Sequence, residues 1–289
     1  MSDYVHPELL ASTEWAGEHL RDPKIRLVEV GWNSAGYESG HIPGAVCWVR
    51  NGNVFQSSVR DILGKTALET QLSQAGVAQD TTVVLYDGFS NLLAAMALWM
   101  LKIYGHQDVR LLDGERTKWT SEGRSLTADI PIIQPTMYKA RKPDWTLRAH
   151  HDLVHEGIDK LNRLLVDART VAMYRGEDTM GRSFGGHIPG AINVPAVMEM
   201  DNGQFRRWIT PTTNADGTFK SADELRALFS SKSITPDKEV ITYCVRGGLS
   251  THMWFVLKYL LGYPEVREYD GSWAEWGNLI GVPVERVIS

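Results

Sequence analysis

The chain has little of what marks a secreted, membrane-spanning or disulfide-rich protein. Its 289 residues include two cysteines, which excludes a disulfide scaffold and fits a reducing compartment. The longest apolar run, Leu92 to Leu101, is about half of what a membrane span requires. Residues 1–10 carry Asp3 and Glu8 without an apolar stretch, unlike a secretory signal. We therefore expect a cytoplasmic protein.

An excess of positive charge is also lacking. Lys and Arg total 30 against 35 Asp and Glu, for a formal charge of −5, which argues against nucleic acid or an anionic membrane as the main partner. No Cys/His cluster has metal-ligand spacing and no glycine-rich phosphate-binding motif occurs, so we expect no metal and no nucleotide cofactor. At 43% hydrophobic residues, the chain can bury the core of one large or two medium domains.

The most informative feature of the sequence is an internal duplication. The block Gly40–Ala45 recurs letter for letter as Gly186–Ala191. Eight later residues also have ordered counterparts: Val83, Tyr86, Gly105, Val109, Arg110, Asp113, Gly114 and Trp119 match Val240, Tyr243, Gly262, Val266, Arg267, Asp270, Gly271 and Trp276. These eight pairs are 157 residues apart, whereas the two blocks are 146 residues apart, so the second copy contains an insertion, which we place around residues 200–217.

The duplication predicts two domains of one fold. We place the N-terminal domain at residues 1–125, a linker at 126–145 and the C-terminal domain at 146–289. Pro131, Pro135 and Pro143 fall in a stretch without clear periodicity, as expected for an extended linker.

Each copy is expected to alternate strands and helices. The predicted strands are Ile25–Val30, Val46–Val49, Thr82–Tyr86 and Val109–Leu112 in the first copy, and Leu164–Asp167, Glu239–Tyr243 and Val266–Tyr269 in the second; the predicted helices are Leu92–Tyr104 and Ser250–Leu261. This alternation predicts an α/β fold with an open, mostly parallel sheet and helices on both faces. Such sheets bind ligands at the carboxyl ends of their strands.

One cysteine stands at such a strand end. The strand Glu239–Tyr243 leads directly into Cys244, and a short loop then leads to the next helix. Ser250 or Thr251 is expected to cap that helix, because hydroxyl oxygens accept hydrogen bonds from the first N–H groups. The thiol therefore lies beside the partial positive charge of a helix N-terminus.

The loop itself also favours the thiolate over the thiol. Gly247 and Gly248 allow successive backbone N–H groups to point inward as an anion nest, and Arg246 adds a fixed positive charge. The same donors can hold an anionic substrate or a negatively charged sulfur intermediate. We therefore predict that Cys244 is a catalytic nucleophile.

The first copy serves as an internal control. Asp87 holds the position that matches Cys244, and no arginine follows it. We infer that the N-terminal domain is a degenerate copy without the reaction. Cys47 lies inside the predicted strand Val46–Val49 and is interpreted as a core residue.

With these features in place, the chain resembles the tandem-domain rhodanese family, and is similar to thiosulfate sulfurtransferases of the bacterial type. The resemblance extends from about Leu10 to Ile280. It is carried by the two Gly-His-Ile-Pro-Gly-Ala blocks, the six-residue Cys244–Leu249 loop, the run Trp254–Gly262 and the segment Tyr269–Trp273.

The resemblance implies a two-step sulfur transfer. Cys244 would take the outer sulfur of thiosulfate as a persulfide, expel sulfite, and pass the sulfur to cyanide or a thiol acceptor. We expect the donor to bind to the loop residues Val245, Arg246, Gly247, Gly248, Leu249 and Ser250, with Arg182 as a further cation.

The loop departs from the family pattern, so the donor stays open at this stage. Val245 stands where bacterial thiosulfate sulfurtransferases usually have arginine, and Leu249 stands where a basic or hydroxyl residue is usual. The alternative is a 3-mercaptopyruvate sulfurtransferase; a persulfide carrier or a non-catalytic binding module are further alternatives. A cysteine phosphatase is disfavoured because its arginine position is occupied by Ser250.

The remaining candidates are given mainly structural roles. His41 and His187 belong to the duplicated block, and one copy has no nucleophile to serve. Asp167 and Arg169 are expected to form an ion pair that orders a loop. His252 is expected to pack in the core, while Trp32 is expected to form an apolar wall, and Arg206 and Arg207 have no assigned role.

Overall fold

The computed structural model divides into two compact units. The N-terminal unit comprises Glu8–Trp145 and Asn214–Phe219, and the C-terminal unit comprises Met1–Pro7, Thr146–Thr213 and Lys220–Ser289. The structure describes residues 3–57, 60–158, 160–179, 184–201 and 204–287, with the side chains of 198–208 left out.

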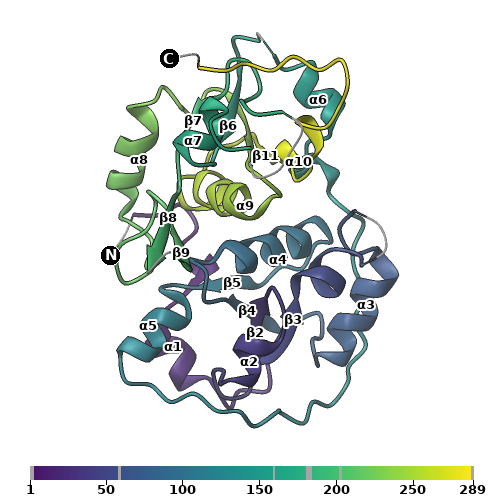
Figure 1. Cartoon of the computed structure of the whole chain (residues 1–289). Helices are drawn as coiled ribbons and strands as arrows, with labels where there is room; N and C mark the ends of the chain where they lie inside the picture. The colour runs from purple at the N-terminus through teal and green to yellow at the C-terminus, as the bar shows by residue number, and fades with distance from the viewer. Residues whose placement is uncertain (1–2, 58–59, 159, 180–183, 202–203, 288–289) are drawn as a thin grey trace. The chain divides into compact units, whose positions relative to one another are not determined.

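The N-terminal unit is built on a five-stranded sheet in which every neighbouring pair is parallel, in the order β1-β5-β4-β2-β3 (Figure 1). Its strands are β1 (Leu10–Ala11), β2 (Ile25–Gly31), β3 (Val46–Val49), β4 (Thr82–Tyr86) and β5 (Val109–Leu112). Its helices are α1 (Thr13–Glu18), α2 (Ala35–Glu38), α3 (Lys65–Gln74), α4 (Leu92–Ile103) and α5 (Glu115–Ser121), with shorter helical turns at Pro7–Leu9 and Arg50–Val54.

The C-terminal unit repeats this plan with a four-stranded parallel sheet in the order β11-β10-β6-β7. Its strands are β6 (Arg163–Asp167), β7 (Ile192–Asn193), β10 (Glu239–Tyr243) and β11 (Val266–Glu268). Its helices are α6 (His151–His155), α7 (Val171–Arg175), α8 (Ala222–Ser230), α9 (Gly248–Phe255) and α10 (Ser272–Trp276), with shorter helical turns at Trp145–Leu147 and Val256–Leu260.

The predicted fold class is confirmed: each unit is an α/β domain whose open parallel sheet has helices on both sides. The predicted bounds of β3, β4, β5 and β10 agree with the structure residue for residue. Buried β-branched runs such as Val83–Val84 and Val240–Ile241 form the central strands, because both faces of these strands are covered.

The insertion in the second copy contains a feature that the sequence analysis did not predict. The strands β8 (Val197–Asp201) and β9 (Gln204–Ile209) pair antiparallel as a separate two-stranded sheet. After α5 ends at Ser121, the chain forms no further helix or strand before Trp145. Its one β-type contact in this fully described segment is an isolated bridge between Thr127 and His41.

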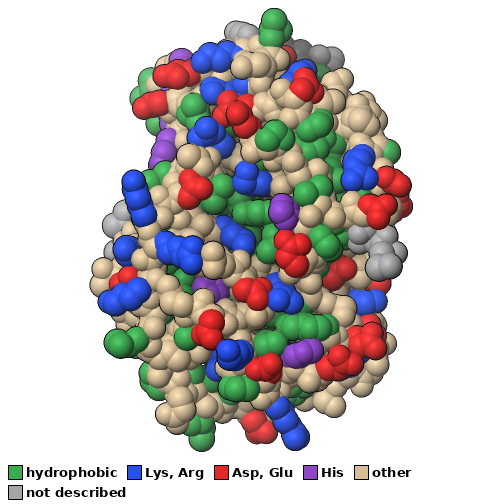
Figure 2. Space-filling model, turned by 180° about the vertical axis from the view of Figure 1, so that it is seen from behind, with side chains coloured by type: hydrophobic (Ala, Val, Ile, Leu, Met, Phe, Trp, Pro, Cys, Tyr) green, Lys and Arg blue, Asp and Glu red, His purple; other side chains and the backbone are tan. Residues whose placement is uncertain are grey.

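The surface carries both signs of charge. Figure 2 shows basic and acidic side chains interspersed over the face that it displays, as the small net charge predicts. Within the part of the chain that the structure describes, no helix has the length and apolar character needed to cross a membrane.

The duplicated block has the same structural role in both units. The buried Tyr86 and Tyr243 end their central strands, and each hydroxyl accepts a hydrogen bond from the backbone N–H of the isoleucine in the block, Ile42 at 3.0 Å and Ile188 at 3.2 Å. The block is thereby held against the carboxyl end of the strand that leads into Asp87 or Cys244.

Candidate functional site

Cys244 directly follows β10, an inner strand of the C-terminal sheet, and its side chain is 1% exposed. Its backbone N–H donates to the Oγ of Ser272 at 3.1 Å. Ser272 starts α10 with a φ of 52°, a left-handed conformation that a non-glycine residue adopts only where its surroundings hold it. The backbone of the cysteine is therefore fixed by a second segment as well as by the strand.

The sulfur of Cys244 lies at the start of α9. The backbone N–H of Gly247 donates to Sγ at 3.2 Å, and Gly247 caps the helix with a φ of 93°. A side chain at this position would be strained, so glycine is what allows the chain to turn back over the sulfur. The helix dipole adds partial positive charge at the same place, so the sulfur lies beside groups that stabilise negative charge.

The predicted helix cap was wrong. The helix begins at Gly248, so Ser250 and Thr251 lie in its first turn rather than before it. Their hydroxyls donate to the carbonyl oxygen of Gly247 at 3.2 and 2.8 Å. The reason is that the glycine pair makes the turn tight enough for the helix to start immediately after the loop.

The predicted substrate-binding residues lie in different surroundings. Arg246 is exposed, Val245 and Gly248 are half-buried, and Leu249 and Ser250 are buried. Arg182 lies outside the described residues, as do the side chains of Arg206 and Arg207. The exposed guanidinium of Arg246 is thus the cation that the loop itself places at the surface.

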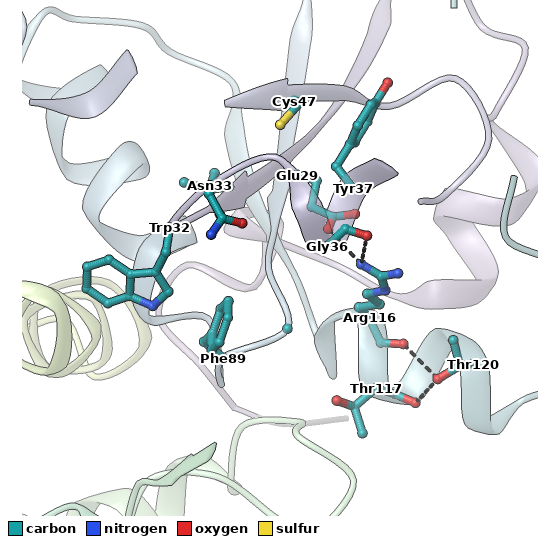
Figure 3. A pocket seen from close by; sticks show the side chains of 13 residues that line it. Glu29, Trp32, Asn33, Gly36, Tyr37, Cys47, Phe89, Arg116, Thr117 and Thr120 are labelled. Atoms are coloured by element: carbon teal, nitrogen blue, oxygen red, sulfur yellow. Dashed lines mark hydrogen bonds and ion pairs between the residues drawn. The ribbon is translucent and has the colours of Figure 1, made fainter. Parts of the chain in front are cut away.

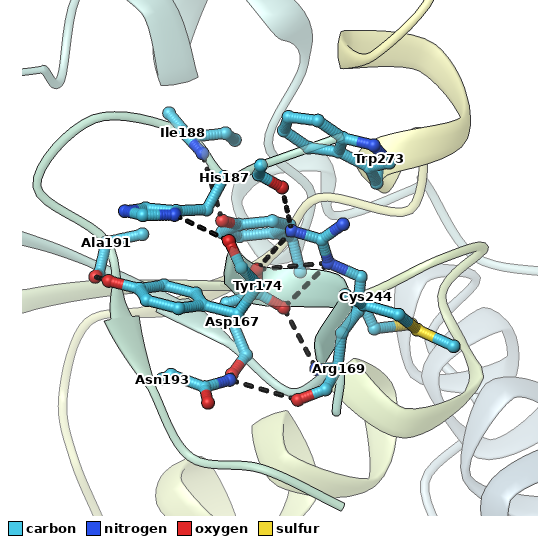
Figure 4. A network of polar contacts seen from close by, with 12 residues as sticks. Asp167, Arg169, Tyr174, His187, Ile188, Ala191, Asn193, Cys244 and Trp273 are labelled. Atoms are coloured by element: carbon cyan, nitrogen blue, oxygen red, sulfur yellow. Dashed lines mark hydrogen bonds and ion pairs between the residues drawn. The ribbon is translucent and has the colours of Figure 1, made fainter. Parts of the chain in front are cut away.

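The predicted ion pair of Asp167 and Arg169 is confirmed (Figure 4). The guanidinium donates to both carboxylate oxygens, with Nη2 at 2.6 Å from Oδ2, and the pair is almost fully buried. Nη2 also donates to the carbonyl of Gly186 at 2.7 Å, and the ring of Trp273 lies 4.4 Å from Cζ. Although burial opposes the charge, the carboxylate raises the pKa of Arg169 above its ordinary value, so the guanidinium stays charged.

The N-terminal unit reaches the same arrangement with an arginine from another element. Arg116 of α5 donates to Glu29 at 2.7 Å and to the carbonyl of Gly40, the first residue of the duplicated block. Arg116 matches Trp273 in the repeat, so the alignment of the two copies does not indicate that Arg116 takes the place of Arg169. The first glycine of each duplicated block, Gly40 or Gly186, is therefore bound by an arginine, but the two arginines come from different positions in the repeat.

The two histidines of the duplicated block have the structural role predicted for them. His41 and His187 are buried, and each ring stacks on a tyrosine, Tyr37 or Tyr174, with centroids 3.6 Å apart. In both, Nδ1 lies within hydrogen-bond distance of the carbonyl oxygen of that tyrosine. His252 is also buried, with Nε2 at 2.7 Å from the Oγ1 of Thr212, in agreement with the predicted packing role.

Asp87 is the residue of the N-terminal unit at the position that matches Cys244. Its carboxylate accepts hydrogen bonds from four backbone N–H groups, those of Phe89, Asn91, Leu93 and Ala94, at 2.7 to 3.1 Å. The last two belong to the first turn of α4. The strand–loop–helix connection of this fold is thus an anion-binding site in the N-terminal unit, where the anion is a side chain.

A cavity of about 490 Å³ lies at the carboxyl ends of the strands of the N-terminal unit. Trp32 and Phe89 point toward the same space, with Glu29, Cys47 and Arg116 among the other lining residues (Figure 3). Trp32 therefore lines this cavity of the N-terminal unit, and its side chain is half exposed.

Cys47 is half-buried and packs against the core of the N-terminal unit. Burial, together with the nearby Glu29, raises the pKa of its thiol to about 11. This thiol is protonated near neutral pH, so the cavity contains no activated nucleophile.

No group of three or more His, Cys, Asp or Glu side chains in the described part of the chain is arranged to hold a metal ion. Ser272 and Glu268, which contact the Cys244 loop, were not identified from the sequence as site residues. Ser272 directly follows Asp270-Gly271, a pair that is repeated in both copies, and this repetition could have pointed to Ser272 as a site residue.

The chain is similar to known proteins over its whole length. The family model described as rhodanese-like domain matches residues 12–122 and again residues 150–279. The sulfur carrier protein TtuD of Thermus thermophilus is 45% identical, with 98% of each chain covered. A protein named "Putative thiosulfate sulfurtransferase" from Saccharopolyspora erythraea is 40% identical, with 96% of each chain covered.

A solved structure of related architecture is that of an anaerobic ergothioneine biosynthesis enzyme from Chlorobium limicola, in complex with trimethyl histidine. It superimposes with a TM-score of 0.86 at 25% identity, and the match covers 100% of this chain and 72% of that one.

Proposed function

Because the chain belongs to the rhodanese-like sulfurtransferase family, we propose that it transfers the outer sulfur of thiosulfate through a persulfide on Cys244. The observation that carries this proposal is the contact between the Gly247 N–H and the Cys244 Sγ at the start of α9. It places a buried sulfur among donors that stabilise negative charge.

In the first step the Cys244 thiolate attacks the outer sulfur of thiosulfate. The S–S bond of thiosulfate breaks, sulfite leaves with the bonding electron pair, and the sulfur remains on Cys244 as a persulfide anion. Arg246 and the N–H groups of Gly247, Gly248 and Leu249 bind the anionic donor and stabilise the charge on the persulfide.

In the second step cyanide or a thiolate attacks the terminal sulfur of the persulfide. The new bond to the acceptor forms as the persulfide S–S bond breaks, and the thiolate of Cys244 is restored. No proton or electron from a cofactor is needed in either step.

The experiment that tests this proposal is mass spectrometry of the protein after thiosulfate treatment. We expect the peptide that contains Cys244 to gain one sulfur atom, and to lose it on addition of cyanide. The Cys244→Ser variant should gain no sulfur and catalyse no transfer, whereas Cys47→Ser should keep most of the activity. A Cys244→Ser protein with full activity would refute the mechanism.

A persulfide-carrier role is the second candidate, favoured by the 45% identity to a sulfur carrier protein. A carrier forms the same persulfide but passes it to a partner protein and turns over slowly with cyanide. Steady-state turnover with cyanide separates the two roles. The ratio of the rates with thiosulfate and with 3-mercaptopyruvate as donor separates the thiosulfate enzyme from the mercaptopyruvate alternative.

A further inference from the structure

A buried carboxyl group lies beneath the Cys244 loop. Glu268, the last residue of β11, is fully buried. The hydroxyl of Ser250 lies 2.5 Å from its Oε1, and the hydroxyl of Thr242 lies 2.6 Å from its Oε2. Both carboxyl oxygens thus have partners, as a buried polar group requires.

This cluster is connected to the sulfur by a short chain of contacts. The hydroxyl of Ser250 also donates to the carbonyl oxygen of Gly247 at 3.2 Å. The N–H of the same glycine donates to the Cys244 Sγ at 3.2 Å. Because Gly247 holds a left-handed conformation, a change in its orientation would move the N–H away from the sulfur.

The N-terminal unit provides a natural comparison. The matching positions there hold three leucines, Leu85, Leu93 and Leu111, all of them buried. The register agrees as well, since Leu85 pairs with Leu111 across two parallel strands as Thr242 pairs with Glu268.

The fold therefore packs well with apolar residues at these three positions. Burying a carboxyl and two hydroxyls instead costs free energy that their hydrogen bonds only partly offset. The polar cluster occurs in the unit that carries the thiol, which indicates a role other than packing.

We propose that Glu268 and Ser250 are positioning residues for Cys244: Glu268 holds Ser250, and Ser250 holds Gly247 with its N–H directed at the sulfur. This inference rests on the proposed function, because it assigns the two residues to the reactivity of the same thiol.

The surroundings of Glu268 support its neutral form. Burial, followed by the nearby Cys244, raises the pKa of Glu268 well above its ordinary value, and Asp270 acts in the same direction. Asp270 is itself paired with Arg148 at 2.8 Å. A charged Glu268 would repel the thiolate, whereas a protonated one does not.

The hydroxyls can accommodate the extra proton. When Glu268 donates to one of them, that hydroxyl can direct its own hydrogen to a carbonyl oxygen, Gly247 for Ser250 or Arg267 for Thr242 at 3.4 Å.

The test is the rate of alkylation of Cys244 by iodoacetamide across the pH range, in the full chain carrying Cys47→Ser so that one thiol remains. Ser250→Ala and Glu268→Leu should slow alkylation at neutral pH by about tenfold, since each removes a buried hydrogen bond next to the loop. Glu268→Gln keeps a neutral group that accepts and donates hydrogen bonds, so it should stay within about twofold of the parent.

Glu115→Gln is the matched control. Glu115 is a buried carboxyl of the N-terminal unit whose pKa is raised well above its usual range by burial and by Asp87. Its substitution should leave the alkylation of Cys244 unchanged. Circular dichroism identifies variants that fail to fold. If Glu268→Leu fails to fold, the alkylation rates of Ser250→Ala and Glu268→Gln test the proposal without it.

The proposal is overturned if folded Ser250→Ala alkylates at the parental rate, or if Glu268→Gln is slowed by about tenfold. These results leave the proposed function in place, because the parent thiol is still reactive. An inert thiol in the parent protein would instead contradict the proposed function, and this inference with it.

Discussion

Asp87 and Cys244 occupy the same position in their units, and each accepts a backbone hydrogen bond from the loop that follows it. The Asp87 carboxylate accepts four from the loop and the first turn of α4, including that of Phe89 at 2.8 Å, and the Cys244 Sγ accepts that of Gly247 at 3.2 Å. A carboxylate cannot form a persulfide, whereas a thiolate can, because it is a sulfur nucleophile. The duplication thus uses one anion-binding connection for structure in one unit and, as we propose, for chemistry in the other.

The first prediction concerns Asp87. Replacing Asp87 by Ala leaves four buried N–H groups at the start of α4 without their acceptor, so the variant should lose about 3 kcal/mol of stability. Urea unfolding measures this loss. The alkylation rate of Cys244 in the folded variant should not change, and a large change would show that the two units are coupled in a way we do not expect.

Arg246 is predicted to act on donor binding. Arg246→Ala should weaken the binding of thiosulfate by about 1.5 kcal/mol, the lower end for a hydrogen bond to a charged group, because the guanidinium is exposed. The measurement is KM for thiosulfate at low salt. Arg246→Lys keeps the charge and should recover part of the loss, and the effect should diminish as salt is added. An unchanged KM in Arg246→Ala would assign donor binding to other groups.

The buried pair of Asp167 and Arg169 is predicted to be costly to break. Arg169→Ala leaves the Asp167 carboxylate buried without its cation, which should lower the free energy of unfolding by about 3–5 kcal/mol. Arg116→Ala is the matched change in the N-terminal unit and should cost less. Burial already raises the pKa of its partner Glu29, so that carboxyl can take up a proton instead. Equal losses in the two variants would contradict this reasoning.

His106 is predicted to contribute to acid destabilisation. It is buried, with Nε2 3.0 Å from the Thr81 carbonyl and Nδ1 3.1 Å from the Tyr138 hydroxyl, and burial lowers its pKa from 6.5 to about 4. Between these two pH values the unfolded chain binds the proton and the folded protein does not. Stability from this group is therefore present above pH 6.5 and is lost as the pH falls toward 4, by about 3 kcal/mol in total.

The measurement is the free energy of unfolding from pH 7 to pH 4 for the parent and for His106→Gln, which cannot be protonated. The difference between the two should shift in favour of the variant as the pH falls. Asp113, whose pKa is raised to about 6 by burial, acts in the opposite direction but is present in both proteins. A difference that is constant with pH would contradict the prediction.

Much of the fold was predictable because its signals are local. The repeated block, the β-branched runs and the glycines that follow them are contiguous in the chain, and they determine strands, turns and the parallel arrangement. The position of Cys244 at the end of β10 followed from the same signals. The helix cap was misplaced by three to four residues, because a glycine pair allows a tighter turn than a hydroxyl cap requires.

By itself, the sequence determined that the chain is a duplicated α/β protein with one thiol at a strand end beside a helix. Only the tertiary structure decided which distant side chains support that thiol. Ser272 holds its backbone, and Glu268 lies beneath its loop through Ser250. Arg116 replaces an arginine that the N-terminal unit lacks at the matching position. These contacts join residues far apart in the chain, and they depend on strand register and on side-chain burial, for which a linear pattern carries no signal.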